Sequence, residues 1–238
     1  MQTRTIDIHG EIEDKLIDSV VRDLRNIFEY NKFLLDTFVN PIKEIIQVVE
    51  LDIDSPGGYV TGFTRIKKEI DKLKEQGVHI KTYVSGHAYS CGFVIALLGD
   101  ERSGSEFCQL MNHQASGFSY GKTSDKYRKA KLDLKMEQKF IDFIVERTDL
   151  TKEYLEERIE INDWFDYDDC VECGIFTKET DKKTTEVKLS EVIAELVENG
   201  YEVVDDLKEE IKEEVVKEEV VKKPKTVTKK PKLKTTSK

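Results

Sequence analysis

SGHAYSCGF, residues 85–93, lies between two apolar runs, VHIKTYV before it and FVIALLG after it. Small residues gather at this junction, which predicts a strand that ends in a tight turn and opens a buried helix. Ser90 would then lie in the positive field of the helix N-terminus, beside backbone N–H groups that have no helical partner. On this stretch alone two interpretations stay open, because a serine before an apolar run is commonly a helix cap and less often a nucleophile.

Strand and helix patterns alternate on both sides of this corner. The expected strands are 3–10, 45–54, 78–84 and 105–113, and the expected helices are 11–38, 63–73, 125–147, 151–161 and 189–200. A strand, a helix and a second strand form the repeating unit of a parallel sheet. The sequence therefore predicts an α/β fold.

The charge of the chain is distributed unevenly. The 238 residues carry a formal net charge of −10, although residues 222–238 contain eight lysines and no acid. The rest of the chain has a formal net charge of −18 and would repel nucleic acid phosphates, so we expect no nucleic acid partner. No apolar run approaches the roughly 18 residues that span a bilayer, and the polar N-terminus is not typical of a signal peptide. We expect a cytoplasmic protein with no membrane contact.

The four cysteines do not predict a metal site. Cys170 and Cys173 form a CxxC pair, but zinc takes four ligands, and Cys91 and Cys108 supply no second pair at the required spacing. We expect reduced thiols that fill the core. The glycine pair in DSPGG, residues 54–58, lacks the GxGxxG spacing of a nucleotide site, and we expect no cofactor.

Two further positions are candidates for chemistry. Gly58 ends DSPGG directly after a strand, where bare backbone N–H groups can approach a ligand, although an ordinary strand-to-helix turn has the same composition. His113 ends another strand, where histidine is either a polar loop residue or a proton acceptor. Of the other histidines, His87 is expected to be a surface or pocket-wall residue, and His9 and His79 are expected to be lone residues at strand ends.

Three pieces, DSPGG (54–58), GHAYSCG (86–92) and MNHQ (111–114), resemble in this order the motifs of the Clp protease proteolytic subunit, the ClpP family of serine peptidases. The resemblance extends over about residues 4–176. It implies a crotonase/ClpP-like fold of stacked parallel βαβ units with a protruding handle helix that begins near residue 125. On this basis we expect a peptidase domain at 1–186, a C-terminal helix at 187–203 and a disordered, charged tail at 204–238.

The resemblance also assigns roles to residues. It implies Ser90 as the nucleophile and His113 as its general base, with the backbone N–H groups of Gly58 and Cys91 binding the oxyanion. This agrees with the chemistry, because a serine hydroxyl becomes nucleophilic when a base takes its proton and because the tetrahedral intermediate needs prearranged donors.

Serine peptidases of this kind use a catalytic triad, in which a third residue orients the histidine. At this third position the sequence departs from the family pattern. Laid without a gap onto NDWFDYDDCVECG, residues 162–174, the pattern places Asn162 where the family has aspartate. Asp163 takes the position only if one residue is deleted after it. We expect Asn162 to orient His113 through its carbonyl oxygen, as asparagine does in Cys-His-Asn proteases, with Asp163 as the alternative.

The family further implies an assembly and a substrate. We expect heptameric rings, stacked in pairs, in which this serine endopeptidase cleaves unfolded polypeptides fed by an ATP-dependent AAA+ Clp unfoldase. Two alternatives remain: a non-catalytic or weakly active ClpP-like ring subunit, and a related prohead or SppA-type protease. SppA-type enzymes use a lysine base, and the chain has no lysine in a comparable motif.

Overall fold

The computed structural model describes residues 2–38, 43–117, 120–158 and 161–177. Its elements are, in order, β1 (Gln2–His9), α1 (Asp14–Thr37), β2 (Ile46–Ser55), α2 (Val60–Glu75), β3 (His79–Tyr89), α3 (Cys91–Ala96), β4 (Glu101–Gly104), β5 (Gln109–Asn112), α4 (Thr123–Arg147), α5 (Lys152–Arg158), β6 (Asp163–Phe165) and α6 (Tyr167–Glu172). The predicted α/β class and the alternation of strands and helices are confirmed. The expected C-terminal helix at 187–203 and the charged tail at 204–238 lie outside the described residues.

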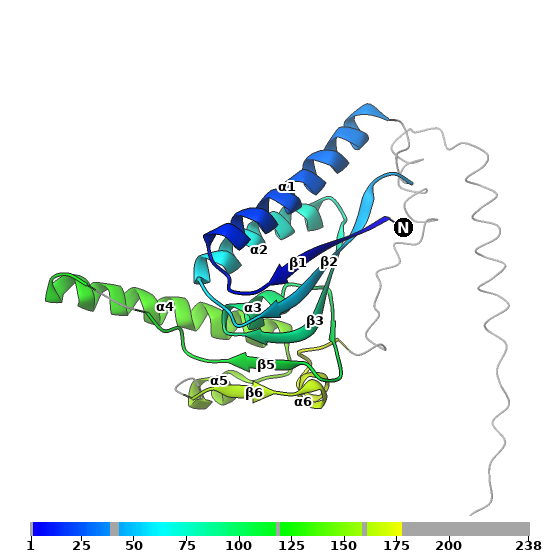
Figure 1. Cartoon of the computed structure of the whole chain (residues 1–238). Coiled ribbons are helices and arrows are strands. Elements are labelled where there is room, and N and C mark those ends of the chain that lie inside the picture. The colour runs from blue at the N-terminus through cyan, green and yellow to red at the C-terminus, as the bar shows by residue number, and fades with distance from the viewer. Residues whose placement is uncertain (1, 39–42, 118–119, 159–160, 178–238) are drawn as a thin grey trace, which may run out of the picture. The chain divides into compact units, whose positions relative to one another are not determined.

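The strands form one largely parallel sheet in the order β1-β2-β3-β5-β6 (Figure 1). The first half of β3 pairs with β4, and its last residues, 87–89, pair with β5. Strand β6 closes the edge by antiparallel pairing with β5. The sequence prediction ended β3 at residue 84 and missed β4, β6 and α6. The extension of β3 to Tyr89 matters for function, because it delivers Ser90 beside the end of β5.

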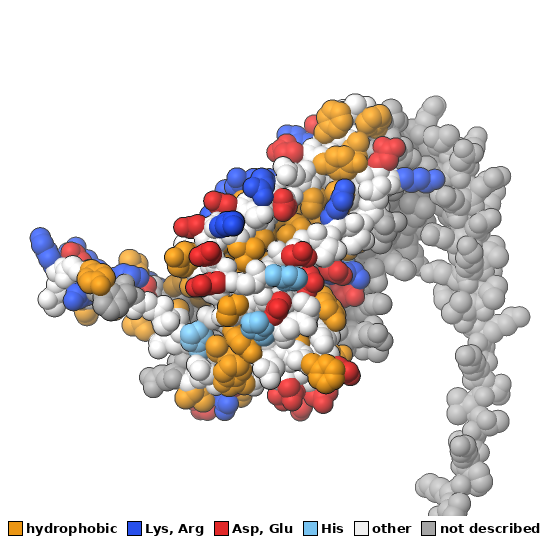
Figure 2. Space-filling model, in the orientation of Figure 1, with side chains coloured by type: hydrophobic (Ala, Val, Ile, Leu, Met, Phe, Trp, Pro, Cys, Tyr) orange, Lys and Arg blue, Asp and Glu red, His pale blue; other side chains and the backbone are white. Residues whose placement is uncertain are grey.

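One face of the sheet carries the core. Helices α1 and α2 lie side by side over this face (Figure 1), and each buries an apolar stripe with helical spacing, including Val20, Leu24, Ile66 and Ile70. The side chains that alternate on the strands toward this face are buried, whereas the opposite face of β1, β2 and β3 presents acids, histidines and tyrosine. Figure 2 shows these red acids and pale blue histidines together on the surface.

Helix α4 projects from the body (Figure 1). Its first half is exposed, and its buried residues, Ile141 and Ile144, belong to the last turns. The buried guanidinium of Arg102 fixes this end, because it donates hydrogen bonds to the carbonyl oxygens of Arg147 at 2.8 Å, Gly174 at 3.0 Å and Ile175 at 2.7 Å. Burial lowers the pKa of Arg102 to about 10. The arginine thus ties the base of α4 to the segment after α6.

None of the helices that the structure describes combines the length and the apolar character needed to cross a membrane.

Candidate active site

Ser90 occupies the corner between β3 and α3 in an uncommon backbone conformation. Its φ of 54° and ψ of −115° make it the only non-glycine residue with positive φ among the described residues. Such angles cost energy for an L-residue and are concentrated at functional sites. The Ser90 N–H donates to the carbonyl oxygen of Met111 at 2.8 Å, which fixes the corner against β5. The Ser90 side chain makes no capping hydrogen bond to α3, so the helix-cap interpretation of this serine is wrong.

His113 lies directly after β5 and faces the corner. Its Nε2 atom is 2.8 Å from Ser90 Oγ, within hydrogen-bonding distance. With the imidazole proton on Nδ1, Nε2 accepts the serine hydroxyl proton, as a general base requires. Both side chains are partly buried. The two residues that the resemblance paired are 23 positions apart in sequence and adjacent in space.

The glycine turn after β2 packs against the same corner. Gly57 and Gly58 have φ of +98° and +146°, and a Cβ atom on Gly57 would lie 2.8 Å from the Cβ atom of Ser90. Only glycine permits this approach. Ser55 Oγ holds the turn, because it accepts the Gly57 N–H at 3.1 Å and donates to the carbonyl oxygen of Gly10 at 2.7 Å. Sequence reasoning missed this positioning role of Ser55, although its place in DSPGG was a signal.

Two backbone donors remain free beside Ser90. Within the described chain, the N–H groups of Gly58 and Cys91 donate to no other residue, and both residues line the cavity at the corner. The Cys91 thiol donates to the carbonyl oxygen of Tyr59 at 3.3 Å, and burial raises the pKa of Cys91 to about 11. The thiol therefore stays protonated and is not activated as a nucleophile.

A cavity of about 100 Å³ opens next to the Ser90–His113 pair. Its walls include Val60 of α2 and Val94 of α3 on the apolar side, and Asn112, Gln114 and Ser116 on the polar side. Helix α4 contributes residues spaced along one helical face, Glu137, Phe140, Ile141 and Ile144. The cavity has the proportions of a pocket for one side chain.

The structure separates the two candidates for the third position. Asn162 is exposed and makes no hydrogen bond to His113 within the described residues. Asp163 is 2% exposed, and in the antiparallel β5–β6 pair it lies directly opposite Asn112, the residue before His113. The strand register therefore brings Asp163, rather than Asn162, inward beside the end of β5.

Only one of the two oxygen atoms of the Asp163 carboxylate accepts hydrogen bonds within the described residues. Its Oδ1 atom accepts hydrogen bonds from Arg158 Nε at 2.7 Å and from the Tyr154 hydroxyl at 3.2 Å. Burial, followed by this contact with Asp163, raises the pKa of Tyr154 to about 12, so the phenol remains a donor. The Oδ2 atom is buried without a hydrogen-bond partner within the described residues. An unpaired buried carboxylate oxygen is costly and is typical of a functional position.

The remaining histidines belong to the polar face of the sheet. His87 contacts the carboxylate of Asp54 and is not among the residues that line the cavity. His9 lies 3.5 Å from Asp52, and His79 lies 3.9 Å from Asp100, so the expectation that both are lone residues is wrong. Asp7, His9 and Asp52 bring one potential ligand atom each within 4.8 Å of one another. Asp7 and His9 are exposed and Asp52 is partly buried, and all three lie outside the lining of the Ser90 cavity.

All four cysteines are free thiols. Cys91, Cys108 and Cys170 are buried, which confirms the prediction that cysteines fill the core. Burial raises the pKa of Cys170 and of Cys173 above the ordinary value for a thiol. This disfavours the thiolate that a metal would need.

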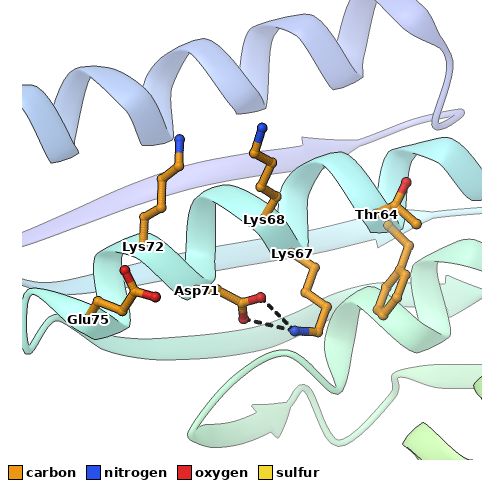
Figure 3. Close-up of a pocket in the computed structure, with 7 residues that line it drawn as sticks. Thr64, Lys67, Lys68, Asp71, Lys72 and Glu75 are labelled. Carbon is orange, nitrogen blue, oxygen red and sulfur yellow. Dashed lines mark hydrogen bonds and ion pairs between the residues drawn. The ribbon is translucent and has the colours of Figure 1, made fainter.

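A larger hollow of about 380 Å³ lies on the outer side of α2 (Figure 3). Its lining includes Lys67, Lys68 and Lys72, and Figure 3 shows Lys67 paired with Asp71, at 2.7 Å. It contains none of the residues of the Ser90 corner. Exposed lysines with local ion pairs are ordinary solvated surface, so we assign no function to it.

Comparison with known proteins agrees with this geometry. The chain combines a parallel α/β fold with a serine and a histidine at a strand-to-helix corner, an arrangement suited to nucleophilic catalysis. The model of the family described as Clp protease matches residues 1–182. The chain therefore belongs to the Clp protease family.

Two relatives illustrate the degree of similarity. The ATP-dependent Clp protease proteolytic subunit 1 of Chlamydia abortus is 28% identical over 182 residues, which cover 70% of this chain and 93% of that protein. The protein of the same name from Chlamydia muridarum is 29% identical over 182 residues, with the same coverage of each chain.

Proposed function

We propose that this chain is a serine endopeptidase that cleaves unfolded polypeptides through an acyl-enzyme. The observation that carries the proposal is the 2.8 Å contact between Ser90 Oγ and His113 Nε2 at a strained corner. Membership of the Clp protease family supports the same reaction class.

The reaction follows from the positions of the groups. His113 Nε2 takes the hydroxyl proton as Ser90 Oγ attacks the scissile carbonyl carbon. The free N–H groups of Gly58 and Cys91 stabilise the negative charge that develops on the carbonyl oxygen. His113 then gives the proton to the leaving amine. In the second step the same histidine activates a water molecule, which hydrolyses the ester bond between the acyl group and Ser90 Oγ.

For the third position we propose Asp163 rather than Asn162. Asp163 is buried, lies opposite Asn112 and has one carboxylate oxygen without a partner, whereas Asn162 is exposed. A rotation that turns Oδ2 toward His113 Nδ1 would fix the tautomer and stabilise the imidazolium that forms during catalysis.

We further propose that the chain works in the cytoplasm within a ring. The exposed half of α4 presents Tyr127, Leu132 and Leu134 to its surroundings, and exposed apolar residues on a projecting helix favour association. As the handle helix of a crotonase-like subunit, α4 would mediate the contact through which two heptameric rings stack as a pair. The relatives named ATP-dependent Clp protease support an AAA+ unfoldase as the partner.

Hydrolysis of fluorogenic peptides, measured beside the mass of the particle in solution, tests the proposal. We expect the wild-type chain to form a ring and to hydrolyse peptides, and Ser90→Ala to form the same ring with a rate at least about 10³-fold lower. Rates that are equal for the wild-type chain and Ser90→Ala would overturn the proposal.

A second candidate is a weakly active ring subunit. It is favoured by one observation, the binding of the Asp163 carboxylate by Arg158 and Tyr154 in place of His113. Normal ring formation with a very slow wild-type rate, raised in Arg158→Gln, would support this candidate.

A further inference from the structure

The cavity beside Ser90 is lined by apolar and neutral polar side chains and by one acidic group. Of the side chains that line it, Glu137 is the only one with a negative charge at neutral pH. It lies one helical turn from Phe140 and Ile141 on the face of α4 that forms the wall. Because the same cavity is lined by Ser90 and His113, its occupant is the side chain of the residue whose carbonyl is attacked.

No cationic side chain of the described residues pairs with Glu137. Within the part of the chain that the structure describes, no hydrogen bond or ion pair joins Glu137 to another residue. Glu137 is partly buried, so its carboxylate is partly withdrawn from water without a compensating charge.

We propose that Glu137 selects substrates with lysine or arginine at the position on the acyl side of the scissile bond. The long methylene stem of these side chains matches the apolar walls formed by Val60, Val94 and Ile141, and the cationic head reaches the carboxylate at the α4 wall. A carboxylate within an apolar pocket selects a cation in this way in trypsin. This inference rests on the proposed peptidase function, because it names the substrate class of that site.

The test compares peptides that differ in one side chain. Fluorogenic peptides with lysine, norleucine or glutamate before the reporter group separate charge from length, because norleucine keeps most of the methylene chain. We expect kcat/KM to be about tenfold higher for lysine than for norleucine, which corresponds to one charge-assisted hydrogen bond. Glu137→Gln should remove this preference, so that the ratio of kcat/KM for lysine to kcat/KM for norleucine falls to about one. Glu146→Gln, an exposed acid on α4 outside the cavity lining, is the matched control and should keep the preference.

A binding measurement separates this inference from the proposed function. Amidated, labelled peptides that end in lysine or norleucine are titrated by fluorescence anisotropy into Ser90→Ala and into Ser90→Ala/Glu137→Gln. Tighter binding of the lysine peptide, lost in the double variant, supports the inference whether or not the wild-type chain is active. Hydrolysis with equal rates for lysine and norleucine would overturn the inference and leave the peptidase function standing. Preferential binding without any hydrolysis would overturn the peptidase function alone, and the absence of both would overturn both.

Discussion

Two buried carboxylates, Glu69 on α2 and Asp163 on β6, are equally inaccessible and are bound in different ways. Both residues are 2% exposed. Both Glu69 oxygens are paired, Oε1 with Arg25 at 2.9 Å and Oε2 with Lys72 at 2.8 Å. In Asp163 only Oδ1 has partners, whereas Oδ2 is buried without one.

The difference supports the proposal that Glu69 is a structural acid and Asp163 a functional one. Burial alone would raise the pKa of Glu69, but hydrogen bonds from Lys72 and Arg25 lower it below the ordinary value. Glu69 is thus fully engaged in holding α1 against α2. Asp163 has an unpaired acceptor next to the strand that carries His113, so its second oxygen is available for the imidazole.

The largest expected difference between the two acids is in their effect on kcat. Asp163→Asn should lower kcat by about 10²- to 10⁴-fold, because an amide cannot stabilise the imidazolium and can fix the wrong tautomer. Glu69→Gln should leave kcat within about twofold of the wild-type value, since Glu69 does not line the Ser90 cavity. Peptide hydrolysis under saturating substrate measures both variants.

Asn162 provides the matched control for Asp163. Asn162→Ala is expected to keep the wild-type kcat, because the Asn162 side chain is exposed and does not contact His113 within the described residues. A rise in kcat on Asn162→Asp, combined with an unaffected Asp163→Asn, would instead identify Asn162 as the third position and would break the comparison.

A smaller effect is expected on stability and its pH dependence. Glu69→Gln should lower the free energy of unfolding by about 1–2 kcal/mol at pH 7, because two charge-assisted hydrogen-bonding partners lose their anion. Since the pKa of Glu69 is lowered on folding, its contribution is complete above the ordinary value of 4.5 and is lost as the pH falls through the folded-state pKa.

Urea unfolding of the wild-type chain and of Glu69→Gln at several pH values measures this contribution. The gap between the two proteins should be widest near neutral pH and should narrow below about pH 4.5. A gap that grows as the pH falls would contradict a lowered pKa and would remove Glu69 as an example of a satisfied carboxylate.

The sequence predicted those parts of the fold that local sequence patterns determine. Apolar alternation and helical spacing predicted β1, α1, β2 and α2, and the small residues around Ser90 predicted the corner. The extension of β3 to Tyr89 was missed, because residues 85–87 look like a turn in the sequence, and only the long-range pairing of residues 87–89 with β5 and of Ala88 with β2 identifies a strand. Gly86 also lies so close to Asp54 that a Cβ atom there would be 2.5 Å from its carboxylate oxygen.

The third position was harder to predict because it depends on a long-range register. Strand β6 has three residues, too few to show an alternation, and its pairing with β5 determines whether Asn162 or Asp163 turns inward. The position of Glu137 in the cavity lining was equally hard to predict, since it depends on how α4 packs beside Val60 and Val94. In both cases tertiary packing, rather than local sequence, selects the residue.

The central claim, that Ser90 is a nucleophile activated by His113, is tested most directly by covalent labelling with a fluorophosphonate followed by peptide mass mapping. We expect one adduct per chain on Ser90 in the wild-type protein, no adduct in Ser90→Ala, and labelling slowed by at least about 10²-fold in His113→Ala. An unlabelled wild-type protein, an adduct on another residue, or a labelling rate unchanged in His113→Ala would contradict the account.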